Sequence, residues 1–355
     1  MLVEFHASGN ASSVPDKIRS EQIIASDVQP GARLLSMELN RILSVCLAVA
    51  VAVEFAPIGA VAGTAADGTV ATQVTSKRGA PWSVQTTPAR VVNGTPLLLL
   101  VTPPAALKSL SGTWLGHDLV FDRTTGKSWL VLAGVSLETK PGSYPLKVDA
   151  VTTAGKQIHF AQNLRVSLAK YPTVQLTVSK QFTAPSPEQQ EKIKADQAVK
   201  QEAFSHVSPE REWTSSFAPP VSAEISDVFG TRRIFNGVTK SVHQGLDYRV
   251  PSSTLVVAVN RGTVILARPL YFEGNCVVID HGQGLLSLYL HLSELKVKEG
   301  DLVERGALIG LSGATGRATG PHLHLAVRWQ GVYLNPAVLL RLQVPDTESS
   351  SARTQ

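Results

Sequence analysis

Cysteine is almost absent from this chain of 355 residues, which has only Cys46 and Cys276. Two thiols cannot form the disulfide framework that stabilises many small secreted domains. They also cannot supply the cysteine pairs that are usual in a structural zinc site. Cys276 falls in a run rich in Val and Ile, where we expect a buried, unreactive thiol.

Charged residues are also sparse, at 17% of the chain, with a formal net charge of +5. Nucleic-acid binding requires Lys and Arg gathered in a stripe or interleaved with aromatic residues. No such cluster is present, and acidic and basic residues nearly balance each other between positions 221 and 340. We therefore expect no nucleic acid among the partners of this protein.

The sequence also lacks a hydrophobic run long enough for a membrane span in its most apolar region. Residues 42–53 are apolar except for Ser44, but this run is shorter than the ~20 residues that cross a bilayer. Ala60-Val-Ala62 follows, a small-x-small pattern of the kind that signal peptidase cleaves. We predict a signal peptide at 37–62 and an exported protein without a membrane segment after cleavage; a retained anchor is the alternative.

The residues before Met37 show no apolar period and do not resemble the start of a signal peptide. Residues 37–41 resemble such a start weakly. We therefore expect translation to begin at Met37, and residues 1–36 to be a non-native upstream extension or disordered.

Length and composition predict two folded units that are mostly β. Domains usually contain ~100–200 residues, and 27 Gly with 21 Pro favour many short strands and turns. Short apolar runs at 97–101, 119–121, 129–132, 144–151 and 174–178 are separated by turn signals. They predict an Ig-like β-sandwich over residues 80–180.

A helix is predicted next in the sequence. Ser186 has the position of an N-cap, Pro187 follows at the first helical position, and Gln189 is three residues after the cap. This pattern predicts a linker helix over residues 186–205. A second domain is expected at 218–340, and a disordered tail at 341–355.

The second predicted domain contains the residues with recognisable chemistry. A separation of four residues places His243 and Asp247 on one face of either a strand or a helix, and Gly245 lets the chain turn closely between them. The alternation His322-Leu-His324-Leu predicts a strand with both imidazoles on one side, about 7 Å apart. Imidazole nitrogen and carboxylate oxygen are both good zinc donors.

A third segment, residues 288–293, alternates in the same way and offers Tyr289 and His291 on one face. Together, the segments provide three protein ligands and an open position for water, which a catalytic zinc site requires. A structural site would need a fourth ligand, usually from Cys. One catalytic zinc ion is therefore expected.

The order of these motifs resembles the LytM/lysostaphin zinc metallopeptidases, which are peptidoglycan endopeptidases. The resemblance rests on His243-x-x-x-Asp247, Tyr289-x-His291-Leu-Ser and Thr315-Gly-Arg-Ala-Thr-Gly-Pro-His322-Leu-His324. Residues 226–230, 274–275, 278–282, 297–303 and 334–336 are similar to the family too, so the likeness covers about a third of the chain. It implies the duplicated hybrid motif fold, a mostly antiparallel β-sheet cleft.

The resemblance also implies roles for the individual residues. His243, Asp247 and His324 would hold the zinc ion. His291 and His322 would be the catalytic pair, one assisting deprotonation of the attacking water and the other stabilising charge on the scissile carbonyl. The sequence does not distinguish which histidine has which role.

Four further assignments concern residues around this set. Tyr289 and Asn275 resemble positions that line the family's cleft, and each is expected either to contact substrate or to be structural. His281 resembles a structural position of the family. Residues 313–320 lack the Gly-Lys-Ser/Thr ending of a phosphate-binding loop and are expected to form a cleft loop.

The function that the resemblance implies is zinc-dependent cleavage of the stem-peptide cross-links of peptidoglycan. With the predicted signal peptide, we expect an exported protein of the periplasm or cell envelope that acts as a monomer. By family analogy, the expected bond joins D-Ala to meso-diaminopimelate, and a pentaglycine bridge is the alternative. The alternative activity is that of a D,D-carboxypeptidase, which acts on a stem peptide that is not cross-linked. A non-catalytic regulator of a cell-wall amidase is disfavoured, because all five site residues are present.

Overall fold

The computed structural model describes residues 81–178, 182, 184–205, 208–237 and 239–348. The predicted extension at 1–36 and the predicted signal peptide at 37–62 lie outside these residues. Among the helices that are described, none is both long enough and apolar enough to cross a membrane.

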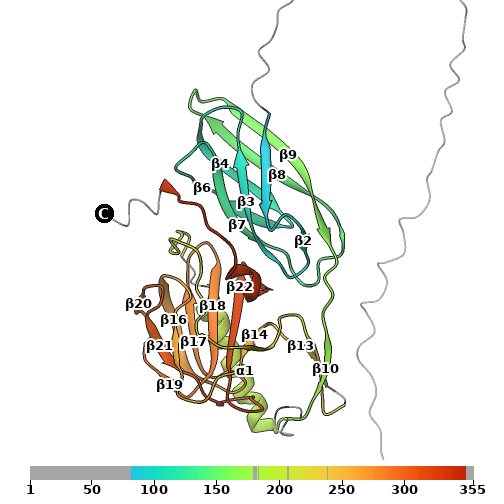
Figure 1. Ribbon diagram of the computed structural model, residues 1–355, viewed down its shortest axis with the longest axis vertical. Coiled ribbons are helices and arrows are strands. Elements are labelled where there is room, and N and C mark those ends of the chain that lie inside the picture. The colour runs from blue at the N-terminus through green and yellow to red at the C-terminus, as the bar shows by residue number, and fades with distance from the viewer. Residues whose placement is uncertain (1–80, 179–181, 183, 206–207, 238, 349–355) are drawn as a thin grey trace, which may run out of the picture. The chain divides into compact units, whose positions relative to one another are not determined.

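Two sheets form the first part of the described chain (Figure 1). One has the strand order β1-β3-β7-β6 and the other β2-β9-β8-β4-β5. Their strands are β1 (Ser83–Thr87), β2 (Val91–Val92), β3 (Pro96–Thr102), β4 (Leu107–Trp114), β5 (His117–Val120), β6 (Asp122–Arg123), β7 (Trp129–Gly134), β8 (Gly142–Thr152) and β9 (Gln157–Ser167).

Strand β8 shows why this part of the sequence folds into sheets. Leu146, Val148 and Ala150 are buried, whereas Lys147 and Asp149 between them are exposed. This two-residue period is typical of a strand with one face on the core and the other in water. The mostly β fold predicted from the sequence is confirmed, and each predicted apolar run overlaps a strand.

An eight-stranded, antiparallel sheet dominates the remainder. Its order is β11-β14-β22-β18-β17-β16-β20, with β23 also paired to β22. Its strands are β11 (Ile225–Asp227), β14 (Gly245–Tyr248), β16 (Gly262–Leu270), β17 (Gly274–Asp280), β18 (Leu285–Leu292), β20 (Leu302–Val303), β22 (Leu323–Trp329) and β23 (Val332–Leu334).

Two smaller sheets, each of three strands, complete this part of the fold. The first, β10-β12-β13, joins β10 (Thr173–Leu176) in parallel to the hairpin of β12 (Arg232–Phe235) and β13 (Thr239–Val242). The second, β15-β21-β19, consists of β15 (Leu255–Val257), β19 (Glu294–Leu295) and β21 (Leu308–Leu311). A short helix, α2 (Pro336–Leu339), follows β23.

The predicted linker helix is α1 (Pro187–Ser205). At its start the Ser186 side chain accepts a hydrogen bond from the Gln189 backbone N–H, and the Gln189 side chain accepts one from Ser186 N–H, as in a capping box. Further along, Val199 and Phe204 pack against a buried cluster of the large sheet that contains Cys276. The expected burial of this thiol is therefore confirmed.

All the described residues belong to one compact unit, so the division at about residue 218 stays a prediction. Leu334 lies directly against Gly134, leaving no space for a side chain there. The end of the chain differs from the predicted tail at 341–355. Leu342 and Thr347 are buried, and Thr347 forms a β-bridge with Thr124, so ordered structure continues to residue 348.

Candidate metal centre and cleft

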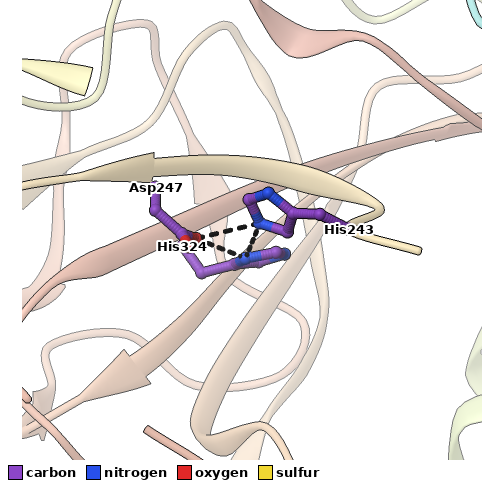
Figure 2. Close-up of side chains that lie close together, drawn as sticks. All are labelled: His243, Asp247 and His324. Atoms are coloured by element: carbon purple, nitrogen blue, oxygen red, sulfur yellow. Dashed lines mark hydrogen bonds and ion pairs between the residues drawn. The ribbon is translucent and has the colours of Figure 1, made fainter. Parts of the chain in front are cut away.

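Two neighbouring strands bring the predicted metal ligands together. Strands β14 and β22 are antiparallel, and their register places Asp247 directly opposite His324. His243 lies just before β14. The atoms His243 Nε2, Asp247 Oδ1 and His324 Nδ1 are separated by 3.0, 3.0 and 2.7 Å (Figure 2). All three residues are buried.

This arrangement fits a metal ion. Ligand atoms that bind tetrahedral zinc at ~2.0–2.1 Å lie about 3.3 Å from one another, close to the observed separations. His243 Nδ1 donates a hydrogen bond to the Val228 carbonyl at 2.9 Å, so in the neutral ring Nε2 carries a lone pair. That lone pair faces the Asp247 carboxylate oxygen, and a cation between them satisfies both.

Gly245 makes room for this cluster. A side chain there would lie 2.4 Å from His324 Nε2 and 2.6 Å from the Leu325 carbonyl oxygen. The expectation that Gly245 lets the chain turn is wrong, because the residue lies inside β14. Its function is to let the His324 ring lie against the backbone.

The charge of the cluster is balanced by a residue that no sequence motif indicated. Arg233, on β12, donates to Asp247 Oδ2 at 2.6 Å and, through Nε at 2.9 Å, to Asp227 Oδ2. Burial raises the pKa of Asp247, but the close polar contacts with His243 and His324 outweigh this effect and hold the pKa well below its usual range. The carboxylate is therefore ionised and available to a cation.

His291 and His322 lie beside the cluster with their rings 4.8 Å apart. Each donates from Nδ1 to a backbone carbonyl at 2.8 Å, His291 to Thr315 and His322 to Gly320. In the neutral rings, both Nε2 atoms are therefore acceptors. Burial, with His324 and His322 nearby, lowers the pKa of His291 to about 3, so this ring is neutral near pH 7.

The prediction that Tyr289 and His291 share one face of the strand is wrong. Tyr289 is fully buried, and its hydroxyl accepts the Val259 N–H at 2.8 Å. The pairing of β17 with β18 shifts register between Val277 and Asn275, and His291 adopts a φ of +64°. This bulge breaks the two-residue alternation, so His291 lines the cleft while Tyr289 supports the core.

The contacts of Asn275 are with the protein's own backbone and loop residues. Its side chain donates to the Ser293 carbonyl, and its backbone N–H donates to the Thr315 hydroxyl at 2.9 Å. Asn275 does not line the cleft. It fixes the loop at 313–320, which contributes Arg317, Thr319 and Gly320 to the cleft wall, as predicted for a cleft loop.

Three further histidines of the described residues lie outside the cluster. His281 is buried between the Arg261 carbonyl and the Ser287 hydroxyl. His159 is exposed and pairs with Asp149. His117 lies against the Trp329 ring, with centroids 4.8 Å apart.

The cleft has a volume of about 460 Å³ and contains all five predicted metal-site and catalytic residues in its lining. An antiparallel-sheet cleft with a His/Asp/His cluster and two flanking histidines defines a metallopeptidase domain of the LytM/lysostaphin type. Residues 241–336 match the profile of Peptidase family M23. These residues therefore form a Peptidase M23 domain.

Two curated relatives resemble this region. The peptidoglycan DD-endopeptidase ShyA of Vibrio cholerae is 42% identical over 127 residues, which are 35% of this chain and 29% of the relative. The DD-carboxypeptidase/endopeptidase Mpg of Neisseria meningitidis is 40% identical over 128 residues, which are 36% of this chain and 29% of the relative. The matches thus span less than a third of the length of these relatives.

A solved structure resembles more of the chain. It is described as a peptidase M23 from Pseudomonas aeruginosa and has a TM-score of 0.54 and 29% sequence identity. The alignment covers 71% of this chain and 95% of that one. The aligned part of this chain is longer than residues 218–340, so the structural similarity extends beyond the predicted C-terminal domain.

Proposed function

We propose that this protein is an exported, zinc-dependent peptidoglycan endopeptidase of the periplasm or cell envelope. The observation that carries the proposal is the convergence of His243, Asp247 and His324 beside His291 and His322 in one cleft. The names of the two relatives, a DD-endopeptidase and a DD-carboxypeptidase/endopeptidase, favour cleavage of the cross-link between D-Ala and meso-diaminopimelate over cleavage of a pentaglycine bridge. The working unit is a monomer.

His243, Asp247 and His324 hold one zinc ion in this proposal. When bound, zinc polarises the attacking water and the scissile carbonyl. Arg233 keeps the Asp247 carboxylate in place through its second oxygen. The Val228 carbonyl does the same for the His243 ring, because a fixed hydrogen bond at one ring nitrogen orients the other.

His291 and His322 supply the proton chemistry. Their Nδ1 atoms are held by backbone carbonyls, so in the neutral form of either ring Nε2 is the acceptor. One ring in this form accepts the proton of the attacking water. The other ring, in its protonated form, donates from Nε2 and stabilises the charge that develops on the carbonyl oxygen. Both rings are required, but their roles are not assigned individually.

D,D-carboxypeptidase activity is the second candidate, because the name of the Neisseria relative combines it with endopeptidase activity. The two reactions differ only in what is attached to the leaving residue. The same cleft serves both, provided that its open side accepts a cross-linked strand.

The test is digestion of purified sacculi by the zinc-loaded protein, followed by mass spectrometry of the muropeptides. We expect cross-linked dimers to become monomers in the wild type. His291→Ala and His322→Ala should retain zinc but lose cleavage, whereas His324→Ala should lose zinc. His159→Ala, in an exposed side chain of the first sheets, is the matched control and should retain both.

Three results would contradict parts of the proposal. If the cross-linked muropeptide dimers stay intact after incubation with the zinc-loaded wild type, the proposed endopeptidase activity is refuted. If only the terminal D-Ala is removed, the protein is a D,D-carboxypeptidase and not an endopeptidase. Loss of zinc from His291→Ala or His322→Ala would refute the division into ligands and catalytic pair.

A further inference from the structure

The acidic residues that line the cleft all have basic partners. Asp227 and Asp247 share Arg233, and Glu273 pairs with Lys200. These carboxylates therefore have partners within the protein, apart from Asp247 Oδ1, which faces the metal site. A cationic group of a ligand would have to compete with Arg233 or Lys200 for them.

Arg317 is a cation in the same cleft wall, and the described residues provide no ion pair or side-chain hydrogen bond for its guanidinium. Its position is nevertheless fixed. The guanidinium carbon lies 4.6 Å from the centroid of the Phe272 ring and 5.3 Å from that of Phe235. Its backbone N–H donates to the Phe272 carbonyl at 2.8 Å.

The loop that carries Arg317 is also locked against the sheet. At Gly316, with a φ of +72°, an added side chain would lie 2.2 Å from the Gly274 nitrogen. The Thr315 hydroxyl accepts the Asn275 N–H and donates to the Leu292 carbonyl, at 2.9 and 2.8 Å. Arg317 is therefore held in one place before any ligand arrives, which lowers the ordering cost of binding.

A fixed guanidinium for which the described residues supply no ion pair is suited to one class of ligand. Its planar donors match both oxygens of a carboxylate, and the flanking rings exclude part of the water that would weaken the attraction. Burial lowers the pKa of Arg317, with Glu273 opposing the effect, yet guanidinium stays charged at any ordinary pH. Arg249 also lines the cleft, but it is exposed.

We propose that Arg317 determines substrate specificity by binding the free carboxylate on the substrate carbon that is bonded to the scissile nitrogen. The inference rests on the proposed function. In the cross-link between D-Ala and meso-diaminopimelate this carbon carries a free carboxylate, and so does the last residue of a D-Ala-D-Ala terminus. An internal bond of a glycine bridge has no carboxylate there. One residue thus accounts for both candidate reactions.

The test compares two synthetic cross-linked dimers that differ only at this group, one with the free carboxylate and one with a carboxamide. The kcat/KM of the zinc-loaded wild type should be roughly 10- to 100-fold higher for the carboxylate, as expected for a hydrogen-bonded charge pair. Arg317→Gln should lose this preference and cleave both at about the wild-type rate for the carboxamide. Arg317→Lys should retain part of it.

The matched control is Arg268→Gln, which removes the same charge from β16, where Arg268 forms an exposed ion pair with Glu299. This variant should keep the full preference for the carboxylate substrate. Calorimetric binding of the monomeric product that carries the carboxylate provides a second readout. Its affinity should fall by a similar factor in Arg317→Gln, and affinity for the amidated product should not change.

The outcomes separate the two proposals. If the zinc-loaded wild type cleaves neither dimer, the proposed endopeptidase is refuted. If it cleaves both equally well, or if Arg317→Gln keeps the preference, only the role of Arg317 is refuted. Equal losses on both dimers in Arg317→Gln would show that Arg317 merely supports the Phe235 and Phe272 rings, which also overturns the inference.

Discussion

Substitution of Gly245 by alanine should damage the metal site by adding a single methyl group. The new carbon would lie 2.4 Å from His324 Nε2, 2.5 Å from His324 Cε1 and 2.6 Å from the Leu325 carbonyl. Normal contacts between such atoms are ~3.5 Å, so the His324 ring must retreat by roughly 1 Å. Gly245 does not have a positive φ, so the effect is steric.

A shift of this size exceeds what zinc coordination accepts. Zinc–nitrogen bonds are ~2.0–2.1 Å with a tolerance of about 0.2 Å. We expect Gly245→Ala to weaken zinc binding at least ~100-fold, equivalent to about 2.8 kcal/mol. Overpacking should also lower the free energy of unfolding of the metal-free protein by ~1–3 kcal/mol.

Competition against a chromophoric chelator measures the zinc affinity, and urea unfolding with excess chelator measures the stability. The matched control is Gly126→Ala, where the added carbon meets only the Thr124 hydroxyl at 3.7 Å. This control should stay within ~0.5 kcal/mol of wild type. Zinc affinity of Gly245→Ala within threefold of wild type would refute the steric argument.

Three further changes test other parts of the structure. Burial lowers the pKa of His281 from 6.5 to about 4. Between these pH values His281 is protonated in the unfolded chain but neutral in the folded protein. Between pH 7 and 4 the wild type should lose up to ~3 kcal/mol of unfolding free energy relative to His281→Gln in urea titrations, and parallel pH profiles would contradict this. Asp122→Ala should leave the buried guanidinium of Arg211 without its 3.3 Å ion-pair partner and cost about 3 kcal/mol by thermal unfolding. Asp149→Ala, which breaks an exposed pair, should cost under ~0.5 kcal/mol, and equal losses would count against the burial argument. Chelation should lower the melting temperature of the zinc-loaded wild type but not that of His324→Ala; an equal response would place the metal elsewhere.

The metal ligands could be predicted because their spacing in the sequence is short and indicates which side chains share a face. The alternation of His322 and His324 indicates a strand, and the interval between His243 and Asp247 keeps both on one face whatever the backbone does. The sequence could not give the register that sets Asp247 opposite His324. That register depends on packing between distant strands, and only the family resemblance linked the motifs.

The errors arose where a local rule was overridden by tertiary structure. Alternation placed Tyr289 and His291 on one face of the strand, but the bulge at His291 directs only that histidine to the cleft. A non-glycine residue at positive φ costs ~1–2 kcal/mol, and packing around it must supply that energy, which no local pattern reveals. Arg233 was missed for a related reason, since it enters the site from a separate hairpin and belongs to no motif.

The pairing of β14 with β22 determines when the metal site comes into existence. Asp247 and His324 are 77 residues apart in the chain, and the segments between them include three central strands of the sheet. An unfolded or half-assembled chain offers isolated ligands, and closing so long a loop around an ion is entropically unfavourable. We therefore expect metal binding to follow the pairing of β14 with β22.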